Sequence, residues 1–459
     1  MMKNNIKSLL ALISLTAFMV GCQDALDIKP AQSLSIDQAL STPENIQAIL
    51  LGAYDDAGQT GSYGGNLNLA SELLGTTNEV SWQGTFLQPR QFFQKNITID
   101  NSFVSGAWTN AYQIINLANV VIENSSIFTD ADEKDRVEGE AQFLRGMAYF
   151  DMARFFGSTY VAGQVNSQLA VPLSLEAILS TEGNDFAVPR STVEEIYAQA
   201  VTDLESAATK LPDSNGYLAT SSAANALLAR VYLQMGNFAA ARDKANSVIG
   251  TNDFSLTSSY ADAFNNGTNS TEDIFAWQVT DQDGTNGMNT YWATRAFGGR
   301  GDIPVQASFR NTFEPNDQRG DFYYTQSNGT FSLKWQNQFA NVIYIRLAEM
   351  YLIRAESNFR LTTSIGATPT ADINRIRNRA GLTGPLNDFD PILNPITLQD
   401  ILDERKKELA FEGHLLHDVK RLGLTAGGKN FDDPLLVFPV PQAELDANPS
   451  LIQNTGYNN

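Results

Sequence analysis

Apolar side chains recur at the spacing of one helix face over much of the chain. The first such segment opens at Thr42 and Pro43, an N-cap residue followed by a residue suited to the first helical turn. Ile46, Leu50 and Ala53 then repeat at helical intervals. Comparable patterns predict further helices over residues 108–122, 130–156, 191–211, 344–361, 370–380 and 397–412. The sequence therefore predicts a mainly α-helical fold.

The segment 223–249 predicts how these helices pack. It has small and large side chains at the spacings of a tetratricopeptide helix pair. Gly236 is placed to make the turn, while Tyr232 and Phe238 fill the angle between the two helices. Since residues 344–380 carry a looser version of the same pattern, we expect a frame of stacked tetratricopeptide-like helix pairs.

Two long regions, 58–101 and 251–341, interrupt the helical pattern. Both are rich in Gly, Asn and Thr, and both contain scattered aromatic residues. Irregular segments of this length in a compact protein tend to be functional. We interpret both regions as variable loops bearing short strands, and we expect them to carry the ligand site.

The N-terminus has the features of an export signal. Lys3 and Lys7 precede an apolar run over 9–20, which is shorter than the roughly 20 residues needed to span a bilayer. Gly21 and Cys22 follow it, in the arrangement of a lipoprotein signal. We expect a signal peptide over 1–21, a lipidated Cys22 with a tether over 22–36, and a single helical domain over 37–459.

Composition narrows the classes of function. Cys22 is the only cysteine, so a chain lipidated there has no thiol for a disulfide, a nucleophile or a metal ligand. Acidic residues outnumber basic ones by 51 to 31, which gives a net charge of −20. This balance argues against nucleic acid as a partner, because such binding depends on Lys and Arg meeting phosphates.

Several motifs, taken in order, resemble those of the SusD/RagB family of Bacteroidetes nutrient-uptake lipoproteins. They include Glu138-Gly139-Glu140-Ala141, Glu408-Leu409-Ala410-Phe411-Glu412-Gly413 and Phe438-Pro439-Val440-Pro441. The resemblance covers nearly the whole chain after Cys22 and is strongest over 138–150, 223–249, 346–377, 404–421 and 438–449. These motifs are mainly structural, and their Arg and Glu side chains are expected to form ion pairs that dock one helix on another.

The resemblance also implies a function. Similar proteins are lipid-anchored at the outer membrane, on the cell surface, and they partner a SusC-like TonB-dependent transporter. The expected role is non-catalytic capture of an oligosaccharide or polysaccharide. Two alternatives remain open, namely capture of peptides by the same frame and a protein-only adaptor that uses the tetratricopeptide-like groove.

The candidate ligand site is argued from sugar chemistry. A flat aromatic ring covers the C–H face of a sugar, and nearby polar groups bind its hydroxyls. The predicted platforms, placed among polar residues of the two loop regions, are Trp82, Tyr291 and Trp292. Their predicted polar partners are Asn78, Gln83, Asn289 and Arg295. The remaining tryptophans, Trp108, Trp277 and Trp335, are expected to be structural.

Catalytic chemistry has weak support. His414 and His417 are the only histidines and share a helix face with Asp418, yet they fall in a structural motif without a further Cys or His. We therefore expect no metal site and no cofactor. A glycosidase needs only two carboxylates, which an acidic chain always supplies, but the loop regions contain no recognisable acid motif.

Overall fold

The computed structural model describes residues 36–180, 187–383 and 389–457. The expected signal peptide, Cys22 and most of the tether lie outside this range. The N-terminal half contains α2 (Ile36–Ala39), α3 (Pro43–Gly58), α4 (Asn66–Gly75), α5 (Leu87–Gln94), α6 (Ser102–Asn124), α7 (Ala131–Phe156), α8 (Val193–Lys210) and α9 (Ser221–Gln234). The C-terminal half contains α10 (Phe238–Thr251), α11 (Gly287–Trp292), α12 (Ala307–Arg310), α13 (Leu347–Leu361), α14 (Pro369–Arg379), α15 (Leu398–Glu408), α16 (Leu415–Arg421) and α17 (Gln442–Ala447).

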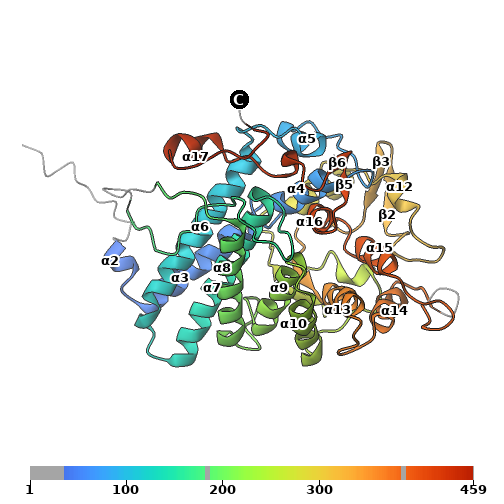
Figure 1. The fold of residues 1–459 in the computed structure, drawn as a ribbon, viewed down its shortest axis with the longest axis horizontal. Coiled ribbons are helices and arrows are strands. Elements are labelled where there is room, and N and C mark those ends of the chain that lie inside the picture. The colour runs from blue at the N-terminus through green and yellow to red at the C-terminus, as the bar shows by residue number, and fades with distance from the viewer. Residues whose placement is uncertain (1–35, 181–186, 384–388, 458–459) are drawn as a thin grey trace, which may run out of the picture.

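The long helices form a continuous stack. Neighbours in the chain pack against each other from α6 through α7, α8 and α9 to α10, and α10 in turn packs against α13 (Figure 1). The predicted tetratricopeptide-like pair is α9 and α10, and Gly236 turns the chain between them with a φ of +69°. The mainly helical fold with a frame of this kind is confirmed.

Strands are few and short. β1 (Asp273–Trp277) pairs antiparallel with β4 (Val342–Arg346), which leads directly into α13. β2 (Tyr323–Gln326) and β3 (Gly329–Ser332) form a hairpin, and β5 (Thr425–Ala426) pairs with β6 (Lys429–Asn430). Strands β1, β2 and β3 lie within the irregular region 251–341, and β4 begins directly after it.

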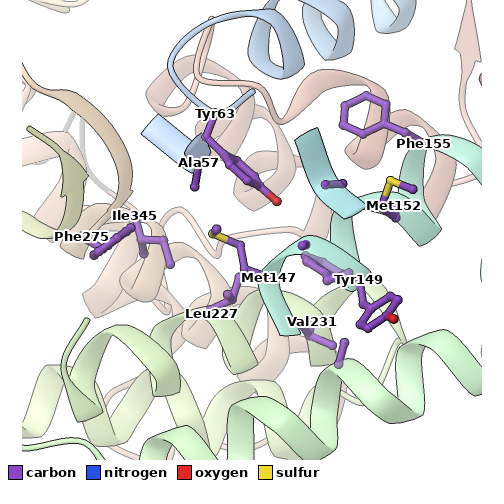
Figure 2. Close-up of a cluster of buried hydrophobic side chains, with 14 of the residues drawn as sticks. Ala57, Tyr63, Met147, Tyr149, Met152, Phe155, Leu227, Val231, Phe275 and Ile345 are labelled. Atoms are coloured by element: carbon purple, nitrogen blue, oxygen red, sulfur yellow. The ribbon is translucent and has the colours of Figure 1, made fainter. Parts of the chain in front are cut away.

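The core lies where the helical stack meets the sheet of β1 and β4. Figure 2 shows Met147 of α7 and Leu227 of α9 pointing toward the same space as Phe275 of β1 and Ile345 of β4. In the same view Tyr63 lies beside Ala57 at the end of α3 (Figure 2), and its ring stacks on Trp277 with centroids 5.6 Å apart. The frame and the second irregular region therefore share one hydrophobic core. Trp108, Trp277 and Trp335 are all buried, as predicted.

The predicted ion pairs between helices are confirmed. Arg346, at the start of α13, is buried and lies 2.6 Å from Glu408 and 2.8 Å from Glu412. Arg145 on α7 pairs with Asp203 on α8 through two nitrogens, at 2.9 and 2.6 Å. The Arg- and Glu-rich motifs therefore join segments that are distant in the sequence.

Three local expectations need correction. The region 58–101 contains α4 and α5, which are too short to produce a sustained helical period. Residues 342–346 form a strand, so the helix predicted from residue 344 begins at Leu347. The helix predicted from residue 191 begins at Val193, because Thr192 is its N-cap and accepts from the backbone N–H of Glu195.

Candidate functional site

The two irregular regions are joined by backbone hydrogen bonds. Residues 79–83 run antiparallel to residues 302–306, and the Gln83 N–H donates to the Asp302 carbonyl at 2.9 Å. The side chain of Gln83 also donates to the carbonyl of Gly301 at 2.9 Å. This paired segment, which we call the loop ladder, fixes the first region against the second.

An aromatic cluster extends from the loop ladder. Trp82 and Tyr291 lie with ring centroids 6.3 Å apart and planes inclined at 48°. Phe86 and Phe103 each contact the same tyrosine ring, at 6.4 and 6.3 Å. Tyr291 is 5% exposed, Trp82 is partly buried, and Phe86 keeps 42% of its surface exposed. The cluster is therefore anchored by Tyr291 and presents Trp82 and Phe86 outward.

Gly84 allows the Trp82 ring to lie close to the backbone. A Cβ atom at this position would stand 2.4 Å from Cζ2 of Trp82 and 2.6 Å from Cγ of Asp302. Trp82 therefore packs over Gly84 beside the Asp302 carboxyl group. The indole Nε1 of Trp82 is buried and has no acceptor within the described ranges, so the indole ring and not its N–H is the part that a ligand can contact.

Charged groups border the aromatic cluster. The Nε of Arg300 donates to Oδ2 of Asp302 at 2.6 Å, and its Nη2 donates to the Thr85 hydroxyl at 3.2 Å. Burial raises the pKa of Asp302, and the adjacent Arg300 opposes that shift. Burial also raises the pKa of Tyr291, which keeps its phenol protonated at neutral pH. Apolar rings and a guanidinium therefore meet on one surface formed by both irregular regions, and the buried Asp302 carboxylate holds the guanidinium there.

Trp292 and Asn289 lie beneath this surface. Trp292 is 0% exposed, and its ring packs on Phe411 with centroids 5.0 Å apart. Asn289 is equally buried, and its amide donates to the carbonyls of Phe297, Trp335 and Gln336. A ligand cannot reach either side chain in this conformation, so we correct their expected role from ligand contact to support of α11.

The other predicted polar residues are exposed but not gathered together. Gln83 belongs to the loop ladder, next to Trp82. Asn78 lies before the ladder, and its carbonyl accepts from the Ser308 hydroxyl at 2.6 Å. Arg295 lies in the 3₁₀ turn Arg295–Phe297, after α11, with its side chain exposed. Of the predicted site residues, Trp82, Tyr291 and Gln83 are the ones that lie together at this surface.

Sequence reasoning missed Phe86, Arg300 and Asp302. Phe86 lies only four positions after Trp82 in the same polar stretch, which was the available signal. Arg300 and Asp302 have no motif of their own. Their position follows from the loop ladder, which pairs segments that no local pattern connects.

A cavity of about 210 Å³ lies at the other end of α11. Asn286 lines it and caps the helix by accepting from the Asn289 N–H at 2.7 Å. Trp277, Gln59 and the exposed Tyr217 contribute aromatic and polar surface. The short helix α11 therefore has one recess at its start and the aromatic cluster at its end.

The two histidines are buried away from this surface. The His417 ring meets Phe155 edge-on at 4.8 Å, and burial lowers the pKa of His414 to about 3. Across 36–180, 187–383 and 389–457, no group of His, Cys, Asp and Glu has the arrangement of a metal site. Over the same ranges, no helix is long and apolar enough to cross a membrane.

Two family models match adjoining parts of the chain. Residues 24–233 match a model described as starch-binding associating with outer membrane. Residues 230–434 match a model described as the SusD family. Together the two matches run from the expected tether to β6 and the turn after it.

Similar proteins agree with both matches. SusD-like protein P2 of Formosa agariphila is 27% identical over 97% of this chain and 98% of its own length. Starch-binding protein SusD of Bacteroides thetaiotaomicron is 27% identical over 28% of this chain and 26% of its own length. The crystal structure of a SusD superfamily protein from the same organism aligns with a TM-score of 0.79 and 25% identity, covering 90% of this chain and 99% of that one. The chain therefore belongs to the SusD family.

Proposed function

We propose that this protein is a non-catalytic, cell-surface lipoprotein that captures an oligosaccharide or polysaccharide for a SusC-like TonB-dependent transporter. The observation that carries the proposal is the aromatic cluster of Trp82, Phe86 and Tyr291, presented by the loop ladder beside Arg300. The match to a family model described as starch-binding supports carbohydrate as the ligand class.

The proposed contacts follow from the exposure of each group. A sugar ring places its C–H face on Trp82 or Phe86, while its hydroxyls bind the partly exposed Arg300, which the buried Asp302 holds in place. Tyr291 acts as the buried anchor that holds both rings in position. Such a site binds its ligand without breaking a bond, because nothing in it activates a nucleophile.

The proposed location and partner rest on other features. A lipid on Cys22 would hold the chain at the outer membrane, in keeping with the family model described as associating with that membrane. The transporter is proposed from the resemblance of the motifs. Replacement of Cys22 by Ser is expected to release the protein from the membrane fraction and to prevent recovery of a transporter with it.

Calorimetric titration of residues 23–459 with a panel of oligosaccharides and peptides tests the ligand class. We expect a glycan to bind, Trp82→Ala to abolish that binding, and Tyr160→Ala to leave it unchanged. Tyr160 is a suitable control because it is a partly buried ring packed on Tyr197, outside the aromatic cluster. Binding of peptides alone would overturn glycan capture, as would glycan binding that survives loss of Trp82.

A further inference from the structure

A second cavity, of about 400 Å³, lies apart from the aromatic cluster. It opens between α15 and α16, beside the C-terminal end of α4 and strand β5. Its wall is mostly apolar and includes Phe309, Leu402, Leu409, Leu415, Val419 and Leu424. A volume in this range suits a small organic ligand.

A buried guanidinium with a free donor lies in the lining of this cavity. Arg405 is 2% exposed, and its Nε donates to Oδ2 of Asp418 at 2.9 Å. Its Nη2 lies 3.7 Å from Glu349 and 3.5 Å from Nδ1 of His414. Its Nη1, in contrast, has no acceptor within the part of the chain that the structure describes. A buried, charged donor without a partner is costly, so an acceptor supplied by a bound molecule would offset that cost.

The charges around Arg405 favour an anionic acceptor. A chain of ion pairs runs through Arg230, Glu349, Arg405, Asp418, Arg421, Glu356 and Arg360. Among the described residues it contains four arginines and three carboxylates, and the additional cation is Arg360 at the end of the chain, whose side chain is 26% exposed to solvent. His414 adds no charge, since its pKa lies at about 3. Each carboxylate of the chain is shared between two arginines, so an anion at Nη1 of Arg405 would face no unpaired carboxylate.

The remaining acidic groups of the cavity do not supply that anion. Glu72 is buried, accepts from the Gly413 N–H at 2.9 Å, and has its pKa raised to about 8 by burial. It is therefore largely protonated at neutral pH and does not repel an anion. Glu79 pairs with Lys406 at 2.6 Å, and Asp403 is exposed at the rim, where water screens it.

We propose that this cavity binds a small apolar carboxylate, with its charged group on Nη1 of Arg405 and its hydrocarbon part along the leucines of α15 and α16. The ligand class follows from the two properties of the site. The apolar wall selects a hydrocarbon, and the guanidinium nitrogen without an acceptor selects an acid over the corresponding alcohol. We expect this site to act independently of glycan capture, because it shares no residue with the aromatic cluster and only Glu79 with the loop ladder.

Titration of residues 23–459 with octanoate and with 1-octanol tests the proposal. We expect octanoate to bind at least about tenfold more tightly than octanol, a ratio that corresponds to about 1.4 kcal/mol. Leu402→Trp, which fills the cavity, is expected to weaken octanoate binding at least tenfold. Leu51→Trp provides the control, since Leu51 is an exposed leucine on α3 outside the cavity. Thermal unfolding confirms that both variants fold.

Arg405→Gln is expected to remove the preference for the acid over the alcohol. If this variant fails to fold, the comparison of octanoate with octanol on the unaltered protein still tests whether the cavity prefers an acid. The proposal is overturned if octanoate does not bind, if octanoate and octanol bind equally, or if Leu402→Trp leaves octanoate binding unchanged. Retention of glycan binding by Leu402→Trp would separate the two sites, whereas loss of glycan binding in a folded Leu402→Trp variant would contradict their independence.

Discussion

The guanidinium of Arg300 lies over the ring of Phe86, 4.1 Å from the ring centroid. The two residues come from different irregular regions, and the contact adds a cation–π interaction to the hydrogen bonds of the loop ladder. Because Arg300 also donates from its Nε to Asp302, its guanidinium is held in place before any ligand arrives. A fixed side chain loses little freedom on binding, which favours affinity.

Replacement of Arg300 by Ala should therefore weaken glycan binding by about tenfold, through loss of a charge-assisted donor and of the order it imposes on Phe86. Calorimetry with the glycan identified in the panel measures this change. Lys134→Ala on α7 removes an exposed positive charge elsewhere and should leave the affinity unaltered. Equal affinities for Arg300→Ala and the unaltered protein would exclude Arg300 from the site.

Gly84→Ala should impair the site without unfolding the protein. The added Cβ would collide with Trp82 and Asp302, so the indole ring must move away from its position beside Tyr291. We expect glycan affinity to fall at least about tenfold while the melting temperature changes little. The matched control is Gly106→Ala on α6, where a Cβ meets no atom within 4 Å. That variant should bind normally and be stabilised by up to about 1 kcal/mol.

Glu72→Gln should change the pH dependence of stability. The pKa of Glu72 is about 8 in the folded protein, above its ordinary value of 4.5, so the folded state holds this proton more tightly than the unfolded state. Glu72 therefore reduces the free energy of unfolding as pH rises from about 4.5 to 8, by up to about 1.4 kcal/mol per pH unit. Glutamine does not ionise and can still accept from Gly413.

The measurement for Glu72 is the melting temperature of both proteins between pH 5 and pH 8. The variant should gain stability relative to the unaltered protein as pH increases. Only the difference between the two proteins is diagnostic, because Lys334 and Lys420 also have lowered pKa values and act in the opposite direction. A difference that stays constant with pH would show that Glu72 is ionised in the folded state.

Asp203→Ala should destabilise the helical stack. The change leaves the Arg145 guanidinium buried between α7 and α8 without its carboxylate, and such losses cost about 3–5 kcal/mol. Denaturant unfolding gives the free energy. Asp243→Ala removes an exposed partner of Arg242 and should change stability by less than about 1 kcal/mol. Similar losses for both variants would show that the Arg145 pair contributes no more than a surface pair.

The helical frame could be predicted because its signals are local. The helix pair α9 and α10 carries its own spacing, its turn glycine and its N-cap residues Thr220 and Asn237. The short helix α4 could not be predicted in the same way. It is buried along most of its length by α16, a segment far away in the sequence, and so has no polar face to mark its period.

The site was only partly predictable for a related reason. Tyr291 and Trp292 are consecutive residues of α11, and successive side chains of a helix point about 100° apart. One ring therefore faces Trp82 while the other enters the core against Phe411. The polar residues around Tyr291 and Trp292 predicted that both rings are platforms. That pattern does not show that Gly287–Trp292, six residues within a loop region, form a helix.

The loop ladder also limits how the binding surface can be altered. Residues 79–83 and 302–306 hold each other in register, so an insertion in either segment would shift Trp82 or Asp302 relative to its partner. To give this frame a different ligand preference, both segments of the loop ladder must therefore be exchanged together.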